Sequence, residues 1–189
     1  KWFEIHQTLL EKRQLHGIEI FNYIEWYPIA LDWCLKKGLA PFANSDIHEP
    51  IQCAYGQDPG FIRPMTLVFA REKSLTGVRE AILQKRTVAW FNGHLAGDAE
   101  ILEKIFHRSV RVAKLFTSNG KTRYLLANQF DIPVHIKGMS EEWKKETILP
   151  GRSESVISIP DQLNSIEITV LNFHTGMKEN LSTRLKLNE

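Results

Sequence analysis

The chain has 189 residues, of which 43% are hydrophobic, and this is enough to bury a core in one large domain or two small ones. Its 24 Lys and Arg residues against 22 Asp and Glu residues give a net charge of +2, which excludes the dense basic face of a nucleic-acid binder. No apolar stretch approaches the roughly 20 residues of a membrane-spanning helix. The two cysteines are too few for a disulfide framework. We therefore expect a globular protein with no membrane span and no nucleic-acid partner.

The start of the chain has the pattern of a segment from the middle of a longer sequence. The first residue is Lys1 rather than a methionine. Apolar residues at positions 2, 5 and 9 give a helical pattern from the first residues onward. No signal-peptide pattern precedes it. We expect that the chain begins in mid-protein, so that its sequence leaves the cellular compartment open.

Residues 1–107 alternate between helical and strand-like patterns. The first helix is expected to stop at Gly17, because glycine tolerates the positive φ of a helix C-cap. Pro28 and Gly38 bracket a second helix in the same way. Strands are expected at 17–22, 39–44, 66–70 and 87–91, and further helices at 73–85 and 97–108. Since parallel neighbours need a crossover, strands spaced by helices predict a parallel sheet or barrel.

The apolar period changes to two at about Ser109. Short alternating runs follow, separated by turn-rich segments such as SNGK and HTGMKEN. This pattern predicts a β-sandwich of six or seven strands over roughly 80 residues. We place the domain boundary near residue 108, which gives an α/β domain at 1–108 and an all-β domain at 109–189.

Asp46 and His48 stand out in the segment NSDIHEP, directly after the strand LAPFAN. In an extended chain, side chains two positions apart point the same way, so both could reach one ion. Chemistry in α/β proteins gathers at the carboxyl ends of strands. A carboxylate with an imidazole suits zinc, manganese or iron. The alternative is an ordinary turn with a solvated histidine, and by itself a single D-x-H motif favours this turn.

Several segments together resemble a known family. HGIEIFN, GLAPFANSDIHEPI, RPMTLVFA and RTVAWFNGHLAGDAEIL resemble the latter part of a PHP (polymerase and histidinol phosphatase) domain phosphoesterase. The segments LLANQFDIPVHIKG, ILPGRSESVISIP and ITVLNFHTGMKENLSTRLKL resemble the C-terminal β-rich module of PHP phosphoesterases of the Sb-PDE type. The resemblance implies a distorted β/α barrel, of which residues 1–108 are the last part, followed by an Ig-like β-sandwich.

The resemblance also implies a metal centre. Such enzymes hydrolyse phosphate esters with two or three divalent ions (Zn, Mn or Fe), and the acid and histidine of their last motif are ligands, which fall on Asp46 and His48. The family's earlier motifs, including an H-x-H pair, have no counterpart in this sequence. A catalytic zinc normally has three protein ligands. We therefore expect this chain to be the C-terminal part of a larger enzyme, with little or no activity alone.

Three further residues are candidates to line the site. Glu19 lies on the strand GIEIFN, where its alternation also fits an outward structural carboxylate, the role that we favour. Asn22 ends that strand and could bond a ligand, but Asn is also a common strand terminator. His94 lies in a predicted loop, where it could approach the site or be solvated. Arg63 and Arg86 could clamp phosphate, but each precedes a strand and so enters at the opposite end from Asp46 if the strands are parallel, unless the loop of Arg63 folds back. Cys53 could add a thiolate, but a buried or idle thiol is favoured.

Two functions remain open from the sequence. The first is metal-dependent hydrolysis of a small phosphorylated substrate by the intact protein, with the remaining ligands supplied by a missing N-terminal segment or a neighbouring chain. The alternative is a non-catalytic binding protein whose Ig-like sandwich carries the function, because such sandwiches host many activities. The family resemblance leans toward an exported or periplasmic bacterial protein, and it gives neither the substrate nor the metal.

Overall fold

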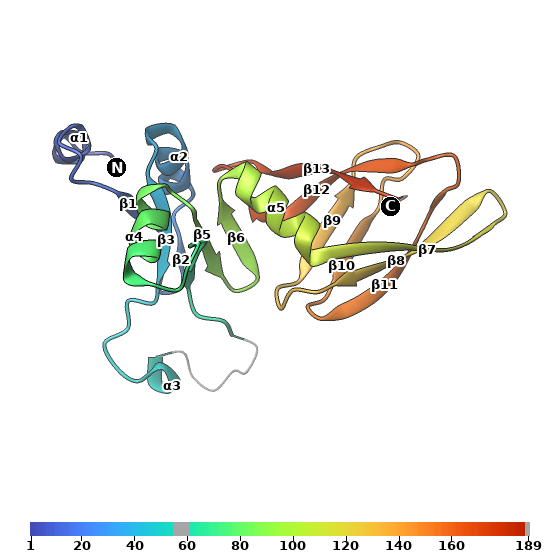
Figure 1. The fold of residues 1–189 in the computed structure, drawn as a ribbon, viewed down its shortest axis with the longest axis horizontal. Helices are drawn as coiled ribbons and strands as arrows, with labels where there is room; N and C mark the ends of the chain where they lie inside the picture. The colour runs from blue at the N-terminus through green and yellow to red at the C-terminus, as the bar shows by residue number, and fades with distance from the viewer. Residues whose placement is uncertain (55–60, 188–189) are drawn as a thin grey trace. The chain divides into compact units, whose positions relative to one another are not determined.

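The computed structural model describes residues 1–54 and 61–187 and divides into two compact units (Figure 1). Unit 1 comprises residues 1–98 with 176–178, and unit 2 comprises residues 99–175 and the chain from 179 onward. Helix α5 (Ala99–Ser109) groups with unit 2 because it contacts strands of that unit. The division into units therefore falls before this helix, whereas the sequence pattern places the domain boundary after it.

Unit 1 mixes helices with two sets of paired strands. Its helices are α1 (Glu4–Glu11), α2 (Pro28–Lys37), α3 (Ile51–Ala54) and α4 (Leu75–Leu83). Its strands are β1 (Gly17–Asn22), β2 (Glu25–Trp26), β3 (Ala40–Asn44), β4 (Met65–Val68), β5 (Thr87–Phe91) and β6 (His94–Gly97). β1 lies between antiparallel β2 and parallel β3, whereas β4, β5 and β6 form an antiparallel ladder.

The prediction of a parallel sheet is thus confirmed for β1 and β3 and wrong for β4, β5 and β6. Helix α4 connects β4 to β5, but these strands run antiparallel. Among residues 1–54 and 61–98 the strands close no barrel, and the prediction that they form part of one stays a prediction.

The segment β1–α2–β3 confirms the sequence pattern closely. Pro28 occupies the first turn of α2, where its missing N–H costs no hydrogen bond. Gly38 ends the helix in the left-handed conformation, with φ 66°, as expected for a glycine C-cap. Ile20, Leu31 and Ala43 are buried in the core that joins these elements. Burial of this apolar face fixes the helix over the two strands.

The first helix is shorter than expected. α1 ends at Glu11, and the chain turns at Arg13, whose φ is 56°. Gly17 therefore caps no helix and instead begins β1. A Cβ at this position would collide with the Phe42 ring and the Ala40 carbonyl oxygen. The glycine is required by the close approach of β3, a constraint that the local sequence does not reveal.

Threonine hydroxyls join β3 to the antiparallel ladder of unit 1. The Thr66 hydroxyl accepts a hydrogen bond from the Ala43 N–H at 2.9 Å and donates one to the Ala43 carbonyl at 3.0 Å. The buried Thr87 hydroxyl donates to the Pro41 carbonyl at 2.9 Å. Side chains of β4 and β5 thus satisfy backbone groups of β3 that would otherwise be unpaired.

Replacing Thr66 with valine should therefore destabilise unit 1. Thr66→Val keeps the side-chain shape but leaves both Ala43 backbone groups without partners, which costs about 1–3 kcal/mol. Chemical denaturation should show this loss, while Thr66→Ser, which retains the hydroxyl, should recover most of it. Equal stabilities of the valine and serine variants would contradict the bridging role.

Unit 2 is built mainly of antiparallel strands. These are β7 (Val110–Ser118), β8 (Lys121–Asn128), β9 (Val134–Gly138), β10 (Glu146–Leu149), β11 (Ser153–Pro160), β12 (Ser165–His174) and β13 (Asn180–Lys186). One set pairs in the order β11-β8-β7 and another in the order β10-β9-β12-β13. The expectation of six or seven strands is confirmed for the described residues. An Ig-like arrangement stays a prediction.

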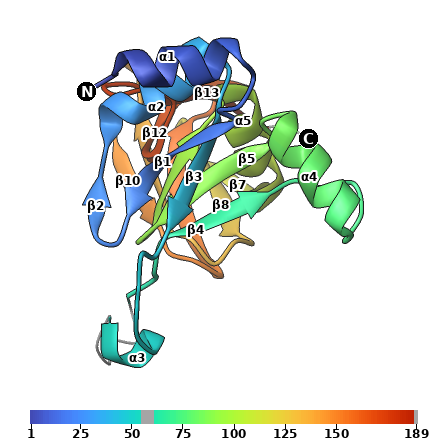
Figure 2. The ribbon, with the colours of Figure 1, turned by 90° about the vertical axis from the view of Figure 1, so that its left-hand side faces the viewer.

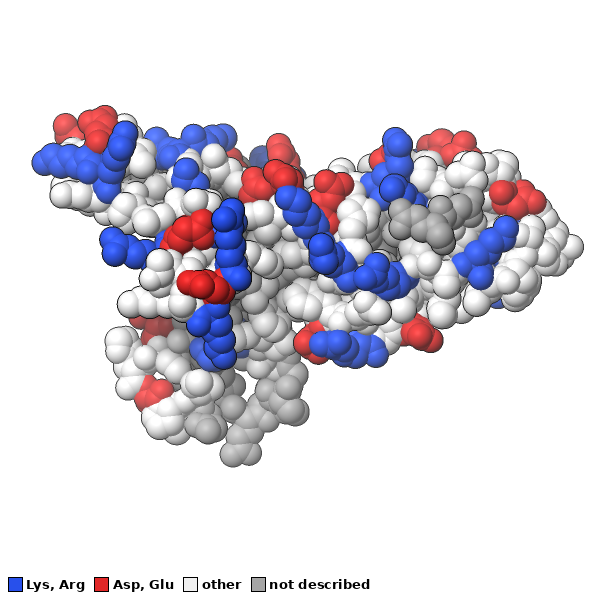
Figure 3. Space-filling model, in the orientation of Figure 1, with Lys and Arg blue, Asp and Glu red and all other residues white. Residues whose placement is uncertain are grey.

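None of the helices within the described ranges is long and apolar enough to cross a membrane. On the face drawn in Figure 3, basic and acidic side chains are interspersed rather than gathered into one patch. This distribution agrees with the near balance of charges in the sequence.

The two cysteines should differ in reactivity. Cys34 is buried in α2, and burial raises the pKa of its thiol to about 12, whereas Cys53 is exposed. Because the thiolate is the reactive form, a thiol reagent should label Cys53 in the folded protein and both residues after unfolding. The raised pKa of Cys34 also implies a stability contribution that is present below pH 9.0 and lost as the pH rises toward about 12.

Cys53→Ser and Cys34→Ser variants assign the labelling. The folded Cys53→Ser protein should be nearly unreactive. Rapid labelling of Cys34 in that variant would contradict the burial of α2.

Candidate functional site

The candidate site lies where β1 and β3 end. The two strands run parallel with Asn22 opposite Asn44, so their carboxyl ends meet at the same edge. The Tyr23 N–H continues the pairing with a hydrogen bond of 3.2 Å to the Asn44 carbonyl. Beyond Asn44 the chain leaves the sheet toward α3, which stands apart from these strands (Figure 2). Residues just after β3 therefore lie beside the end of β1.

Asp46 and His48 share one hollow at this edge. The Asp46 Oδ1 and His48 Nε2 atoms are 3.7 Å apart. The hollow has a volume of about 340 Å³ and is also lined by Tyr23, Ile47 and Glu49. The Asp46 side chain is 56% exposed and that of His48 is 91% exposed, so both can be reached from solvent. The structure thus brings the two predicted residues together, although the imidazole extends outward.

The backbone at Asp46 differs from the extended chain assumed from the sequence. Its φ is 49°, in the left-handed region. Asp adopts this region more readily than most residues because its short side chain can bond locally. The turn therefore sets the orientation of the carboxylate, rather than the alternation of an extended strand.

Glu19 and Asn22 form a hydrogen-bonded cluster with Asn44. One oxygen of the Glu19 carboxylate accepts a bond of 2.8 Å from the Asn22 amide, and the other accepts a bond from the Asn44 amide. Neither Glu19 nor Asn22 lines the hollow of Asp46 and His48. The cluster instead ties the ends of β1 and β3 together through side chains, two residues before Asp46.

The sequence did not reveal that Glu25, Tyr27 and Tyr23 lie at or near this edge of the sheet. The Tyr27 hydroxyl donates a hydrogen bond to the Glu25 carboxylate. This bond is the largest cause of a raised pKa at Tyr27, followed by desolvation and by the negative charges of Glu25, Glu19 and Asp46. Tyr23 lines the hollow itself. The only local signal was that Glu25, in β2, and Tyr27, just before α2, are two positions apart. Only the fold shows that the carboxylates of Glu25, Glu19 and Asp46 all act on Tyr27.

The remaining candidates lie elsewhere. His94 is exposed at the start of β6, and Cys53 is exposed on α3; neither lines the hollow. Arg86 forms an ion pair with Glu80 and donates to the Phe69 carbonyl at 3.1 Å, so its guanidinium has a structural role. Arg63 is half-buried before β4 and does not line the hollow either.

The side chains present fit part of a metal site. An accessible carboxylate and an imidazole are suitable ligands for zinc, manganese or iron. Within residues 1–54 and 61–187, no group of three or more His, Cys, Asp or Glu side chains could hold a metal ion. The described residues of this hollow therefore supply at most two ligands to one ion, although Glu49 also lines the hollow.

Comparison with known proteins gives one close structural likeness. The chain is similar to a crystal structure from Bacteroides vulgatus of a two-domain protein containing a predicted PHP-like metal-dependent phosphoesterase. The TM-score is 0.92 and the sequences are 29% identical, over 99% of this chain and 57% of that protein. This chain thus spans little more than half of its neighbour's length. No protein-family model and no curated protein matches the sequence.

A charge introduced beside Glu19 should test the cluster. Asn44→Asp places a second carboxyl against the Glu19 carboxylate, and the repulsion should destabilise the protein by roughly 1 kcal/mol at neutral pH. The repulsion raises the pKa of one of the two carboxyls, so the lost stability should return as the pH falls and that group takes up a proton.

The matched control is Asn119→Asp, an exposed turn position in unit 2 with a φ of 53°. Thermal unfolding of both variants between neutral and acidic pH gives the comparison. The same pH dependence in the two variants would argue against contact between Glu19 and Asn44.

Proposed function

We propose that this chain is the C-terminal part of a PHP-type metal-dependent phosphoesterase, and that Asp46 and His48 are two of its metal ligands. The observation that carries the proposal is the placement of this carboxylate and imidazole in one hollow at the joint end of β1 and β3. The likeness to a protein containing a predicted PHP-like phosphoesterase supports it independently. Unit 2 would then correspond to the β-rich module of Sb-PDE-type enzymes.

The roles of the residues follow from their positions. Asp46 and His48 would hold a zinc, manganese or iron ion, which when bound supplies an activated water and neutralises charge on the phosphoryl oxygens. The Glu19, Asn22 and Asn44 cluster fixes the strand ends from which Asp46 projects. Tyr23 and Ile47 give the hollow apolar surface that can contact the organic part of a phosphate ester.

The remaining ligands would come from a segment before Lys1. Two ligands are fewer than the three that a catalytic zinc normally has. Because this chain spans 57% of its structural neighbour, there is room in a protein of that length for the earlier motifs of the family. The intact enzyme would carry two or three ions and act on a small phosphate mono- or diester, and this chain alone should be almost inactive.

Metal analysis of the protein encoded by the complete gene tests the proposal. Asp46→Asn keeps a side chain that tolerates the left-handed backbone but removes the carboxylate charge, and His48→Gln removes the imidazole. Both variants should lose bound metal, and hydrolysis of p-nitrophenyl phosphate or bis-p-nitrophenyl phosphate should fall by about 100-fold or more. Elemental analysis and initial rates provide the two readouts.

His16→Gln is the matched control because His16 is exposed and lies away from the hollow. It should retain both metal and activity. Full metal content and full activity in the Asp46 and His48 variants would rule out the proposed ligands.

A further inference from the structure

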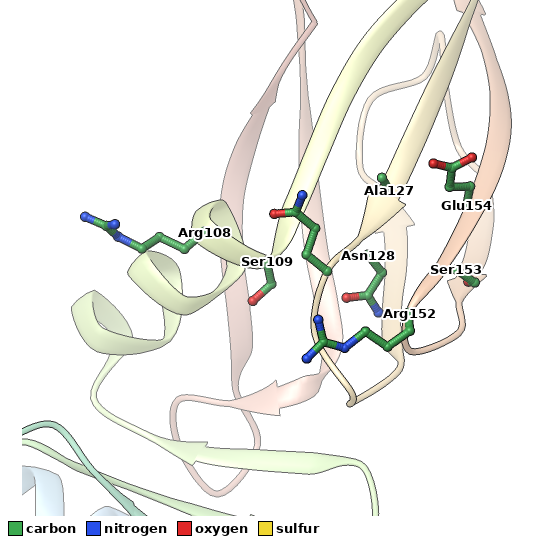
Figure 4. Close-up of a pocket in the computed structure, with 8 residues that line it drawn as sticks. Arg108, Ser109, Ala127, Asn128, Arg152, Ser153 and Glu154 are labelled. Carbon is green, nitrogen blue, oxygen red and sulfur yellow. The ribbon is translucent and has the colours of Figure 1, made fainter.

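A second hollow lies entirely in unit 2, at the ends of β8 and β11 (Figure 4). We call it the Arg152 hollow. It has a volume of about 560 Å³, within the range of small-molecule sites. Its lining is mainly polar and includes Ser109, Asn128, Gln129, Arg152 and Glu154. The proposed phosphoesterase site uses none of these residues.

Asn128 is a firmly held part of the lining of the hollow. Asn128 is only 3% exposed. Its side-chain amide donates to the Ile132 carbonyl at 2.9 Å and to the Leu149 carbonyl at 3.1 Å. Its side-chain oxygen accepts a bond of 3.0 Å from the Phe130 N–H. These bonds join the end of β8 to the loop that follows it and to the end of β10. The hollow is therefore shaped by a buried hydrogen-bonded side chain rather than by a loose turn.

Arg152 is held in position on one wall. Its Nε and one Nη donate to the two oxygens of Asp131, at 2.8 and 3.2 Å. Its φ is 53°, a conformation that costs a non-glycine residue about 1 kcal/mol or more. Asp131 occupies only one edge of the guanidinium. The two Nη groups form a second edge that can donate two parallel hydrogen bonds to a carboxylate or phosphate.

The surrounding groups suit a ligand with an anionic end and hydroxyl groups. In Figure 4 the Arg152 side chain extends toward Ser109, whereas Arg108 extends away and Glu154 lies on another wall. The Ser109 residue is 9% exposed, and its hydroxyl bonds no other described residue. The Glu154 carboxylate can accept hydrogen bonds from ligand hydroxyls. Arg108 makes no ion pair with a described residue, so its charge remains available to attract an anion.

We propose that the Arg152 hollow binds the carboxylate or phosphate group of a small polyhydroxylated molecule, such as a sugar acid or a sugar phosphate. The free edge of the Arg152 guanidinium and the Ser109 hydroxyl bind the anionic group, and Glu154 accepts bonds from the hydroxyls.

Titrations with three probes test the proposal: glucuronate, glucose 6-phosphate and glucose. NMR chemical-shift changes or calorimetry measure binding, with a chelator present so that no metal site takes up the phosphate ester. At least one of the two anionic sugars should bind, with glucose much weaker, and the preferred anion identifies the group recognised. Arg152→Lys removes the planar donor edge and should weaken binding by about tenfold.

Arg152→Gly separates ligand binding from a structural role. Glycine adopts the left-handed backbone without strain, so this variant should keep the thermal stability of the wild type while losing binding. Arg184→Lys is the matched control, because Arg184 forms a similarly exposed ion pair with Glu167, 2.7 Å long, and should bind like the wild type. The proposal is overturned if neither anionic sugar binds, if glucose binds as tightly as they do, or if the Arg152 variants bind as well as the wild type.

Discussion

The parallel pairing of β1 with β3 is the constraint on which the candidate site depends. It places Asn22 opposite Asn44, so that one carboxylate, Glu19, can accept bonds from both amides. A slip of one residue would turn alternate side chains to the other face of the sheet and would separate Glu19 from Asn44. The same pairing fixes where the chain leaves β3, and hence where Asp46 lies. The register of β1 with β3 thus determines the position of the candidate ligand Asp46.

The sequence predicts the elements that depend on local chemistry. Pro28 and Gly38 bracket α2 because a missing N–H and a positive φ are properties of single residues. The turn at Asn92 and Gly93, with φ values of 43° and 82°, is equally local, and its N-G signal could have revealed the hairpin of β5 and β6. Gly17 is different, because its role depends on the Phe42 ring of another strand. The end of α1 and the directions of β4, β5 and β6 depend on such contacts between distant residues, so the sequence predicts them less well.

The same distinction applies to the two hollows. Asp46 and His48 could be singled out because they are close in sequence and follow a strand. Tyr23 directly follows β1, and only the pairing of β1 with β3 brings it to their hollow. In unit 2, Arg152 bonds Asp131 and lines one hollow with Ser109, and Asn128 bonds the loops that carry Asp131 and Arg152. No spacing pattern connects these residues. Residues distant in sequence therefore define the walls of both sites.

The hollow of Asp46 and His48 is maintained against local backbone preference. Tyr23 and Asp46 both line it, and both have positive φ, 53° and 49°. A tyrosine in this region costs about 1–2 kcal/mol, more than an aspartate, whose short side chain can bond locally. The bond from the Tyr23 N–H to the Asn44 carbonyl offsets part of that cost, because it extends the ladder by one residue into the turn. Glycine or asparagine at position 23 would avoid most of the strain but would remove the ring from the wall. The tyrosine is therefore better explained by what its side chain contributes to the hollow than by the stability of the turn.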